Sequence, residues 1–372
     1  CTRLMADLGA EVIKIEPPLG DLLRLAQPRR HGYSAYFAPL NAGKQSLCLD
    51  LKQPRAVELV LQLAEKSAVA VQNFRPGVMR DFGLGYEQLK TRNQKIIYCN
   101  MSGFGQQGPA SDWAAFAPII HAAAGLDFAM MQWQDDITKP HNGSVPFADY
   151  MTGVHGNSAI LAALFRRERT GRGEEIDIAM TEVMYNALSF ELQEANFGLV
   201  GGRLKYRVLR AKEGLFVVNP LSPKNFADLC KATGHPEWLE KYNLRTAERA
   251  QNWSLLLAEV EKWAQDHTAE ECEKIISAQG CPVARLRTIK EALNEPQAQF
   301  RHSSVEVEDG AGPLTVADTP LRMRDSEARI GLNVPGLGEQ TAQILEKVLG
   351  LSLAEIDKLV QAKVAYRQIA PT

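Results

Sequence analysis

Residues 45–74 have the sequence QSLCLDLKQPRAVELVLQLAEKSAVAVQNF, which predicts two buried strands separated by one helix. The apolar residues of Gln45–Leu51 and Val69–Phe74 form short runs bounded by polar residues, as is typical of strands. Between them, the apolar residues of Ala56–Lys66 recur at helical spacing and would give that helix one buried face. A strand, a helix and a strand in this order predict a parallel pair joined by a right-handed crossover.

The same alternation continues on both sides of this segment. Further strand-like runs occur at Ala10–Glu16, Lys95–Asn100 and Glu175–Met180. We therefore predict an α/β fold, with a Rossmann-like parallel-sheet large domain over residues 1–205 and ligands at the carboxyl ends of its strands. Longer helices are predicted at Lys224–Thr233, Ala247–Asp266 and Ala269–Gln279. They indicate a smaller α+β domain over residues 206–320, and residues 321–372 would form a linker and C-terminal helices.

The composition is that of an ordinary soluble globular protein. The 372 residues include 45% hydrophobic and 23% charged residues, and the formal net charge is −2. This charge gives no basic surface for nucleic acid, and no apolar run approaches the roughly 18 residues of a membrane span. The six cysteines lie far apart without a CxxC pair. This pattern indicates reduced thiols in a cytoplasmic protein and predicts neither a disulfide scaffold nor a metal site.

Asp149 is the only carboxylate of Ser144–Gly156, SVPFADYMTGVHG, and a helix is predicted directly after it at Ser158–Arg167. A carboxylate just ahead of a helix can accept hydrogen bonds from the free amides of the first turn, so one interpretation is an N-cap. The other is a catalytic carboxylate on a turn, where Gly153 and Gly156 would let a ligand approach the backbone. The local sequence does not separate these two interpretations.

Six segments in this order resemble the family III CoA-transferases, the group that includes formyl-CoA transferase and crotonobetainyl-CoA:carnitine CoA-transferase. They are CTRLMADLGAEVIKIEPP at 1–18, NAGKQSLCLDL at 41–51, NFRPG at 73–77, SGFGQQGP at 102–109, TGRG at 170–173 and PGLGEQT at 335–341. Each segment alone is a weak signal, but their common order is specific. In this family the aspartate at the position of Asp149 is a covalent nucleophile, which favours the catalytic interpretation.

The resemblance implies an enzyme that moves CoA from an acyl-CoA thioester to a carboxylic acid. Its partners would be acyl-CoA and small carboxylic acids, with CoA as a carrier substrate and no permanently bound cofactor or metal. An aspartyl anhydride and an aspartyl-CoA thioester at Asp149 would be the intermediates. The family also implies an interlocked homodimer in which the C-terminal helices pack back on the large domain.

The resemblance also implies which residues bind CoA. These are Leu49, Lys52, Asn73, Phe74, Arg75, Arg80, Trp113 and Phe116. The chemistry of three of them fits this role, because Asn73 offers amide hydrogen bonds, Phe74 an apolar wall for adenine and Arg75 a fork for phosphate. The alternative is that this segment is only a strand-to-helix turn stabilised by Pro76 and Gly77.

The sequence departs from the family in two regions. Pro17 and Asp81 occupy positions where the family has phosphate-binding arginines, so the residues that meet the CoA phosphates are not defined by the resemblance. Gly201 and Gly202 lie where some members have a longer, mobile glycine-rich substrate loop. Backbone amides in such a loop could stabilise an oxyanion.

Gly103–Gly108, GFGQQG, matches the GxGxxG pattern of dinucleotide-binding proteins and follows a predicted strand. However, Pro109 comes directly after it, and no amphipathic helix is predicted there. A dinucleotide site needs that helix because its N-terminus holds the pyrophosphate. We therefore predict a turn beside the active site and no binding of NAD.

Two alternative functions remain open at this point. An α-methylacyl-CoA racemase shares the fold but needs a histidine upstream of the aspartate as a second acid or base. An alignment anchored on Gly125 places Phe116 at that position, which leaves His121 as a displaced candidate for the second base. The other alternative is a CoA-binding protein without turnover, against which the intact Asp149 argues.

Overall fold

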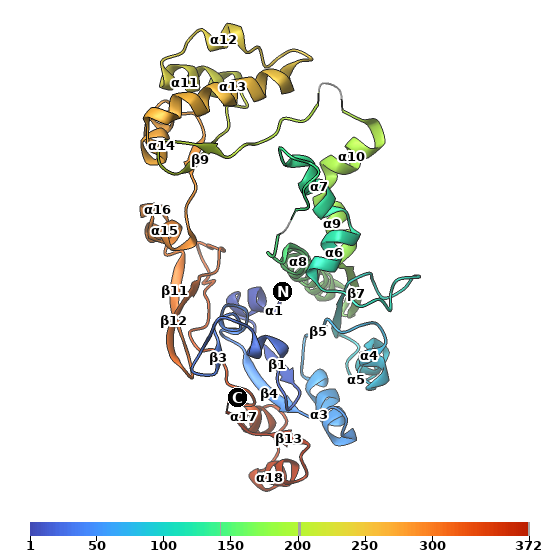
Figure 1. Cartoon of the computed structure of the whole chain (residues 1–372). Coiled ribbons are helices and arrows are strands. Elements are labelled where there is room, and N and C mark those ends of the chain that lie inside the picture. Colours follow the sequence, from blue (N-terminus) through green and yellow to red (C-terminus); the bar gives the residue numbers. More distant parts are fainter. Residues whose placement is uncertain (142, 200–201, 371–372) are drawn as a thin grey trace. The chain divides into compact units, whose positions relative to one another are not determined.

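The chain forms two compact units, and the computed structural model describes residues 1–141, 143–199 and 202–370 (Figure 1). Unit 1 consists of Cys1–Ala124, Ser144–Ala187 and Pro296–Thr372, and unit 2 consists of Gly125–Gly143 and Leu188–Glu295. Both units combine helices with strands, so the α/β class predicted from the sequence is confirmed. The boundaries of these compact units differ from the domain boundaries at 205 and 320 that the sequence pattern predicted. Those domain boundaries stay a prediction.

Unit 1 contains two three-stranded sheets, one with a single parallel pair and one that is parallel throughout. The first consists of β1 (Ile13–Glu16), β4 (Gln45–Leu49) and β13 (Ala365–Tyr366), and the second of β5 (Val69–Gln72), β6 (Ile97–Ser102) and β7 (Glu174–Ala179). β4 pairs in parallel with β1 and antiparallel with β13, whereas β6 pairs in parallel with both of its neighbours. The strands predicted at 45–51 and 69–74 form as β4 and β5, but they belong to different sheets, so the parallel pair predicted between them is wrong. β4 instead pairs in parallel with β1, and β5 with β6. Two antiparallel hairpins, β2 (Arg29–Arg30) with β3 (Tyr33–Ser34) and β11 (Ser304–Asp309) with β12 (Gly312–Ala317), complete the strands of this unit.

Helices cover these sheets. The longer ones are α3 (Pro54–Glu65), α5 (Tyr86–Arg92), α6 (Ala117–Ala123), α8 (Phe147–Thr170), α9 (Met180–Ala187), α17 (Thr341–Lys347) and α18 (Leu353–Gln361). The short ones are α1 (Thr2–Asp7), η1 (Leu22–Leu25), α2 (Ala38–Asn41), α4 (Val78–Asp81) and α16 (Pro296–Phe300). The helical spacing seen in the sequence is confirmed for α3, since Leu59, Val60 and Leu63 are buried in the core that contains Leu47 and Leu49 of β4.

The C-terminal segment returns to β4. Apolar residues of α17 and α18, among them Ile344, Leu345 and Ile356, belong to the same core as the side chains of β4. Figure 1 shows α17, α18 and β13 beside β1 and β4. The Thr341 hydroxyl accepts a hydrogen bond from the Cys48 amide at 3.0 Å, so polar contacts reinforce this packing.

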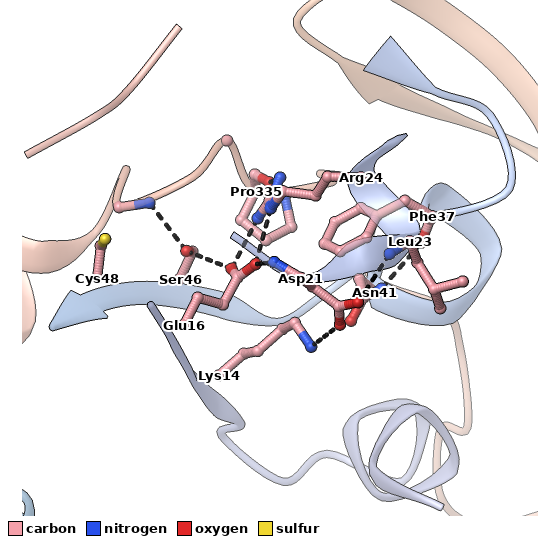
Figure 2. Close-up of polar contacts among 12 residues, drawn as sticks. Lys14, Glu16, Asp21, Leu23, Arg24, Phe37, Asn41, Ser46, Cys48 and Pro335 are labelled. Atoms are coloured by element: carbon pink, nitrogen blue, oxygen red, sulfur yellow. Dashed lines mark hydrogen bonds and ion pairs between the residues drawn. The ribbon is translucent and has the colours of Figure 1, made fainter. Parts of the chain in front are cut away.

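A buried ion pair helps to hold the C-terminal segment against β1 and β4 (Figure 2). The Glu16 side chain is 1% exposed, and Arg24 donates to its two carboxylate oxygens at 2.7 Å each. The Ser46 hydroxyl donates to Glu16 at 2.7 Å and accepts a hydrogen bond from the Gly338 amide at 2.9 Å. Arg24 also donates to the Pro335 carbonyl at 3.1 Å. The segment 335–341 is therefore attached to β1 and β4 through the polar groups around Glu16.

Unit 2 has its own core around a small antiparallel sheet. The sheet consists of β8 (Leu209–Arg210), β9 (Leu215–Val218) and β10 (Val283–Arg285). The helices are α7 (Leu126–Trp133), α10 (Ser189–Phe197), α11 (Pro223–Thr233), α12 (Trp238–Lys241), α13 (Arg249–Trp263), η2 (Ala264–Asp266), α14 (Ala269–Ala278) and α15 (Ile289–Asn294). The helices predicted at 224–233, 247–266 and 269–279 are thus confirmed. Phe216 and Trp253 are fully buried between the sheet and these helices.

Candidate active site

Asp149 lies inside a helix and not ahead of one. The sequence predicted a helix from Ser158, but α8 begins at Phe147 and continues to Thr170. Pro146 is the N-cap residue of α8, so the interpretation of Asp149 as the N-cap is wrong. The prediction missed this start because Thr152, Gly153 and their neighbours have low helix propensity, which tertiary packing overrides. In the first turn, the partial positive charge of the helix N-terminus favours the carboxylate form of Asp149.

The small residues after Asp149 serve helix packing. A Cβ atom at Gly156 would lie 2.8 Å from the sulfur of Met101 on β6. The glycine therefore lets α8 lie close to the sheet, which differs from the ligand approach that the sequence suggested. α8 leads directly into β7, so it runs opposite to the strands. Its 24 residues span about 36 Å, against about 20 Å for the six residues of β7, so the turn with Asp149 lies toward the carboxyl ends of the strands.

A histidine and a tyrosine lie near Asp149. Partial burial raises the pKa of the Asp149 carboxyl above its ordinary value, and positive charge on His121 would oppose this shift. Tyr36, in the turn between β3 and α2, forms a hydrogen bond with the Tyr150 hydroxyl. The pKa of Tyr36 is raised, first by burial, then by its interaction with Tyr150 and last by the negative charge of Asp149. The effect of this charge means that the Tyr36 phenol lies near the Asp149 carboxylate. The phenol of Tyr36 therefore lies near the candidate nucleophile and is neutral at physiological pH.

His121 is buried behind this turn. Its side chain belongs to α6 and is 3% exposed. Its Nε2 atom accepts a hydrogen bond from the Ala148 amide at 3.0 Å. The ring centroid lies 6.4 Å from that of Phe147. His121 thus contacts the residues immediately before Asp149 in the first turn of α8.

A chain of hydrogen bonds holds the predicted CoA loop at the end of β5. The Gln72 side chain accepts from the Phe74 amide at 2.7 Å and donates to Asn100 on β6 at 2.6 Å. Asn100 in turn donates to Glu175 on β7 at 3.0 Å. These bonds cross all three strands of the sheet. They anchor the start of the loop 73–77 at the carboxyl edge of the sheet, where ligands of parallel sheets bind.

Most predicted CoA contacts offer accessible side chains. Seven of the eight are exposed, namely Lys52, Asn73, Phe74, Arg75, Arg80, Trp113 and Phe116. Arg75 has no ion pair with any residue that the structure describes, and Arg80 lies 3.8 Å from the neighbouring Asp81 carboxylate. Trp113 packs edge-on against Phe104, with 5.6 Å between ring centroids. Leu49 differs, because its side chain is fully buried in the core and only its backbone could contact a ligand.

The predicted substrate loop is described only in part. Gly201 lies outside the described residues. Gly202 is exposed in unit 2 and has a φ angle of 80°, which favours glycine. Pro17 is also exposed and offers no cation for phosphate. Lys52, Arg75 and Arg80 are therefore the cations among the predicted CoA contacts that could meet the phosphates.

The GxGxxG segment forms a turn after β6, as predicted. Residues 103–116 are all described and contain no helix, and α6 begins only at Ala117. The Gln106 amide donates to the Asp177 carboxylate at 3.0 Å, so one amide of this glycine-rich segment is already occupied by a protein carboxylate. No helix N-terminus is therefore present after Pro109 to hold a pyrophosphate.

We expect CoA to protect the chain against thermal unfolding and NAD to leave the unfolding temperature unchanged. At 100 times its dissociation constant, a ligand that binds only the native state stabilises it by about 2.7 kcal/mol. Differential scanning fluorimetry with CoA, NAD and NADP at millimolar concentrations checks this, with 3′-dephospho-CoA as the control for the phosphate contacts. Protection by NAD and not by CoA would reverse the assignment of the two loops.

Two negative findings concern the described residues only. Within them, no group of three or more His, Cys, Asp or Glu side chains could hold a metal ion. A membrane-crossing helix is likewise not found in that part of the chain, since none of its helices is both long and apolar enough.

Comparison with known proteins decides the family. A family model described as "CoA-transferase family III" matches residues 1–341. The chain belongs to CoA-transferase family III. It is 31% identical to mouse succinyl-CoA:glutarate CoA-transferase, over 96% of this chain and 85% of that protein. It is 32% identical to acetyl-CoA:oxalate CoA-transferase of Acetobacter aceti, over 92% of this chain and 90% of that protein. A crystal structure of a CAIB/BAIF family protein from Brucella suis is similar to it, with a TM-score of 0.79 and 28% identity over 93% of this chain and 94% of that one.

The family assignment agrees with the resemblance deduced from the six segments, and it identifies the chain as an acyl-CoA:carboxylate CoA-transferase. Sequence reasoning missed two parts of the candidate site. Tyr36 belongs to no motif, and its place beside Tyr150 follows from the turn between β3 and α2. His121 was considered only as a base, whereas its contact is with the Ala148 amide.

Proposed function

We propose that this CoA-transferase works through covalent intermediates on Asp149. The observation that carries the proposal is the environment of this carboxylate, which is exposed, lies in the first turn of α8 and has the Tyr36 phenol near it. The raised pKa makes Asp149 a more basic nucleophile, while the helix N-terminus still supports its ionised form. A thioester carbonyl is an electrophile that such a carboxylate can attack.

The reaction balances in four steps. The Asp149 carboxylate attacks the donor thioester carbonyl, a C–O bond forms, the C–S bond breaks, and CoA leaves as a thiolate from an aspartyl–acyl anhydride. The thiolate attacks the aspartyl carbonyl of the anhydride, which yields aspartyl-CoA and releases the donor acid as a carboxylate. The acceptor carboxylate attacks aspartyl-CoA, which gives a second anhydride and the thiolate. Attack of the thiolate on the acceptor's acyl carbon forms the new acyl-CoA and regenerates Asp149, so the thioester energy is conserved.

Each step passes through a tetrahedral oxyanion that needs hydrogen-bond donors. The Tyr36 hydroxyl is a candidate from unit 1, since it lies near the carboxylate and remains neutral at physiological pH. The amides of Gly201 and Gly202 are candidates from the substrate loop that the resemblance implies. The exposed Phe74 and Arg75 would bind the adenine and a phosphate of CoA.

We expect the chain to exchange CoA between two carboxylic acids and not to exchange the α-proton of a 2-methylacyl-CoA with deuterated water. Phe116 cannot transfer protons, and the Nε2 atom of His121 is occupied by the Ala148 amide. Both assays are run on one preparation. Because glutarate and oxalate occur in the names of two relatives, the acid panel starts with dicarboxylic acids. Deuterium incorporation without acyl exchange would favour the racemase, and binding of CoA without either reaction would favour the non-catalytic alternative.

We also propose that the chain acts as a homodimer, as the resemblance implies. One face of α8 supports this proposal, because it exposes apolar side chains at helical spacing. They are Phe147, Tyr150, Met151, Val154, Leu161 and Phe165. A stripe of this length on a monomer is a sign of a protein contact.

We expect light scattering after size exclusion to give twice the chain mass of 41.1 kDa. The variant Leu161→Glu places a charge in the apolar stripe and should shift the mass toward that of one chain. Glu168→Gln, an exposed change on the same helix, serves as the control and should leave the mass unchanged. A wild-type chain that is monomeric at micromolar concentration would contradict the dimer.

A further inference from the structure

We propose that His121 is a positioning residue for the nucleophile, because it holds the first turn of α8 through the Ala148 amide. The inference rests on the proposed role of Asp149, and it adds a residue that none of the family motifs contains. His121 does not touch the substrate. It acts through the backbone of the turn that carries the carboxylate.

The contact fixes the tautomer of the ring. A backbone amide can only donate, so the Nε2 atom of His121, 3.0 Å from the Ala148 nitrogen, must be unprotonated. The neutral ring therefore carries its proton on Nδ1. His121 is 3% exposed and Ala148 is fully buried, so water does not compete for this hydrogen bond. Without His121 this amide would be buried with no hydrogen-bond partner, which is unfavourable.

The helix needs this bond because its N-terminus has no local cap. The first amides of a helix have no partner within it, and a side chain at the N-cap position usually accepts from one of them. Here the N-cap residue is Pro146, whose side chain has no acceptor. His121, which lies on α6, supplies the acceptor that Pro146 lacks. A cap that comes from another helix fixes where the first turn of α8 lies relative to α6.

The position of the turn decides the position of the nucleophile. Asp149 directly follows Ala148, and consecutive Cα atoms are only about 3.8 Å apart. If the amide of Ala148 loses its partner, the first turn can fray, and the carboxylate moves with it. A misplacement of about 1 Å between reacting groups can lower a rate about 100-fold. The Tyr36 phenol would lose its alignment with the carboxylate in the same movement.

Three substitutions of His121 distinguish the effect of its hydrogen-bond acceptor from the effect of the volume of its ring. In His121→Gln, the side-chain oxygen can occupy the place of Nε2 and accept from Ala148. In His121→Asn, the oxygen matches Nδ1 and falls short of the amide, although the residue stays polar. His121→Leu keeps the approximate volume and has no acceptor.

We expect His121→Gln to keep kcat within about threefold of the wild type, and His121→Asn and His121→Leu to lower it about 30- to 100-fold. KM for the acyl-CoA should stay within about twofold in all three, because the loop 73–77 is anchored through Gln72 on β5 and the hydrogen bond of His121 goes to Ala148, which is not a predicted CoA contact. All rates are measured well below the unfolding temperature of each variant. Hydroxylamine trapping then reports how much intermediate forms on Asp149.

The outcomes distinguish this inference from the proposed function. If His121→Asn and His121→Leu unfold at lower temperature but keep kcat, the histidine is merely structural and the inference fails. It fails equally if His121→Gln loses as much activity as His121→Leu. If Asp149→Ala remains active, it is the proposed function that fails, whatever the His121 variants do. Should His121→Leu not fold, the comparison of Gln with Asn alone decides.

Discussion

Asp149→Ala is expected to lower CoA transfer at least about 1,000-fold while CoA still binds with an affinity within about twofold of the wild type. The carboxylate forms the covalent bond in both halves of the reaction, so its loss removes the only route that conserves the thioester. The predicted CoA contacts lie on the loops after β4, β5 and β6, and none of them needs Asp149. The measurement is CoA exchange between two acids, together with isothermal titration of CoA.

Asp325→Ala is the matched control, since Asp325 is an exposed aspartate away from α8 and its loss should leave the rate unchanged. Borohydride or hydroxylamine added during turnover should modify Asp149 in the wild type and not in the variant. Retention of more than a few per cent of the wild-type rate by Asp149→Ala would sink the covalent mechanism. A rate that falls only because CoA no longer binds would assign Asp149 to binding.

The same variant reveals the energetic consequence of the raised pKa. Because folding raises the pKa of Asp149, the wild type loses stability as the pH rises from the ordinary value of an aspartate through the raised value. Asp149→Ala does not have this loss. At neutral pH the variant should therefore be no less stable than the wild type, and the difference should disappear at low pH. Chemical denaturation at several pH values checks this.

The fold could be predicted where local pattern and packing agree. Residues 45–74 have the alternation of a buried strand, an amphipathic helix and a strand, and the structure has β4, α3 and β5 at those places. The start of α8 could not be predicted in this way, because glycines and β-branched residues are poor helix formers by themselves. Gly156 is required by the close contact with Met101, which depends on the tertiary structure.

The candidate site divides in the same manner. Asp149 and the loop after β5 could be found because each belongs to a segment that resembles the family. Leu49 was predicted from its position in the family motif, but its side chain at the end of β4 is buried and only its backbone is available to a ligand. The sequence does not distinguish a side-chain contact from a backbone contact. Tyr36 and His121 come from distant parts of the chain, and only the tertiary structure brings the turn after β3 and helix α6 to the start of α8. Spacing along the chain carries no signal for such contacts.

Arg24→Ala is expected to lower the free energy of unfolding by about 3–5 kcal/mol, the usual cost of breaking a buried ion pair. Glu16, which is 1% exposed in the wild type, would lose the guanidinium that donates to its two oxygens (Figure 2). The substitution also removes the hydrogen bond to the Pro335 carbonyl, so the C-terminal segment loses one attachment. Urea denaturation measures the change. Arg55→Ala, at an exposed position of α3, is the control and should stay within about 0.5 kcal/mol of the wild type.

The pH dependence of this loss tests its cause. Burial alone would raise the pKa of Glu16, but Arg24, Ser46 and Lys14 outweigh it and hold the pKa below its ordinary value. The ion pair therefore stabilises the wild type above the ordinary pKa of a glutamate, and this contribution is lost as the pH falls through the lowered value. In Arg24→Ala only Ser46 and Lys14 still stabilise the buried Glu16 carboxylate. Protonation of Glu16 removes its charge and therefore makes the variant more stable relative to the wild type. The stability deficit of Arg24→Ala should accordingly shrink between pH 7 and pH 4. A deficit that stays constant over this range would show that Arg24 stabilises the chain through its packing on Phe37, 4.1 Å from the ring centroid, and not through its charge.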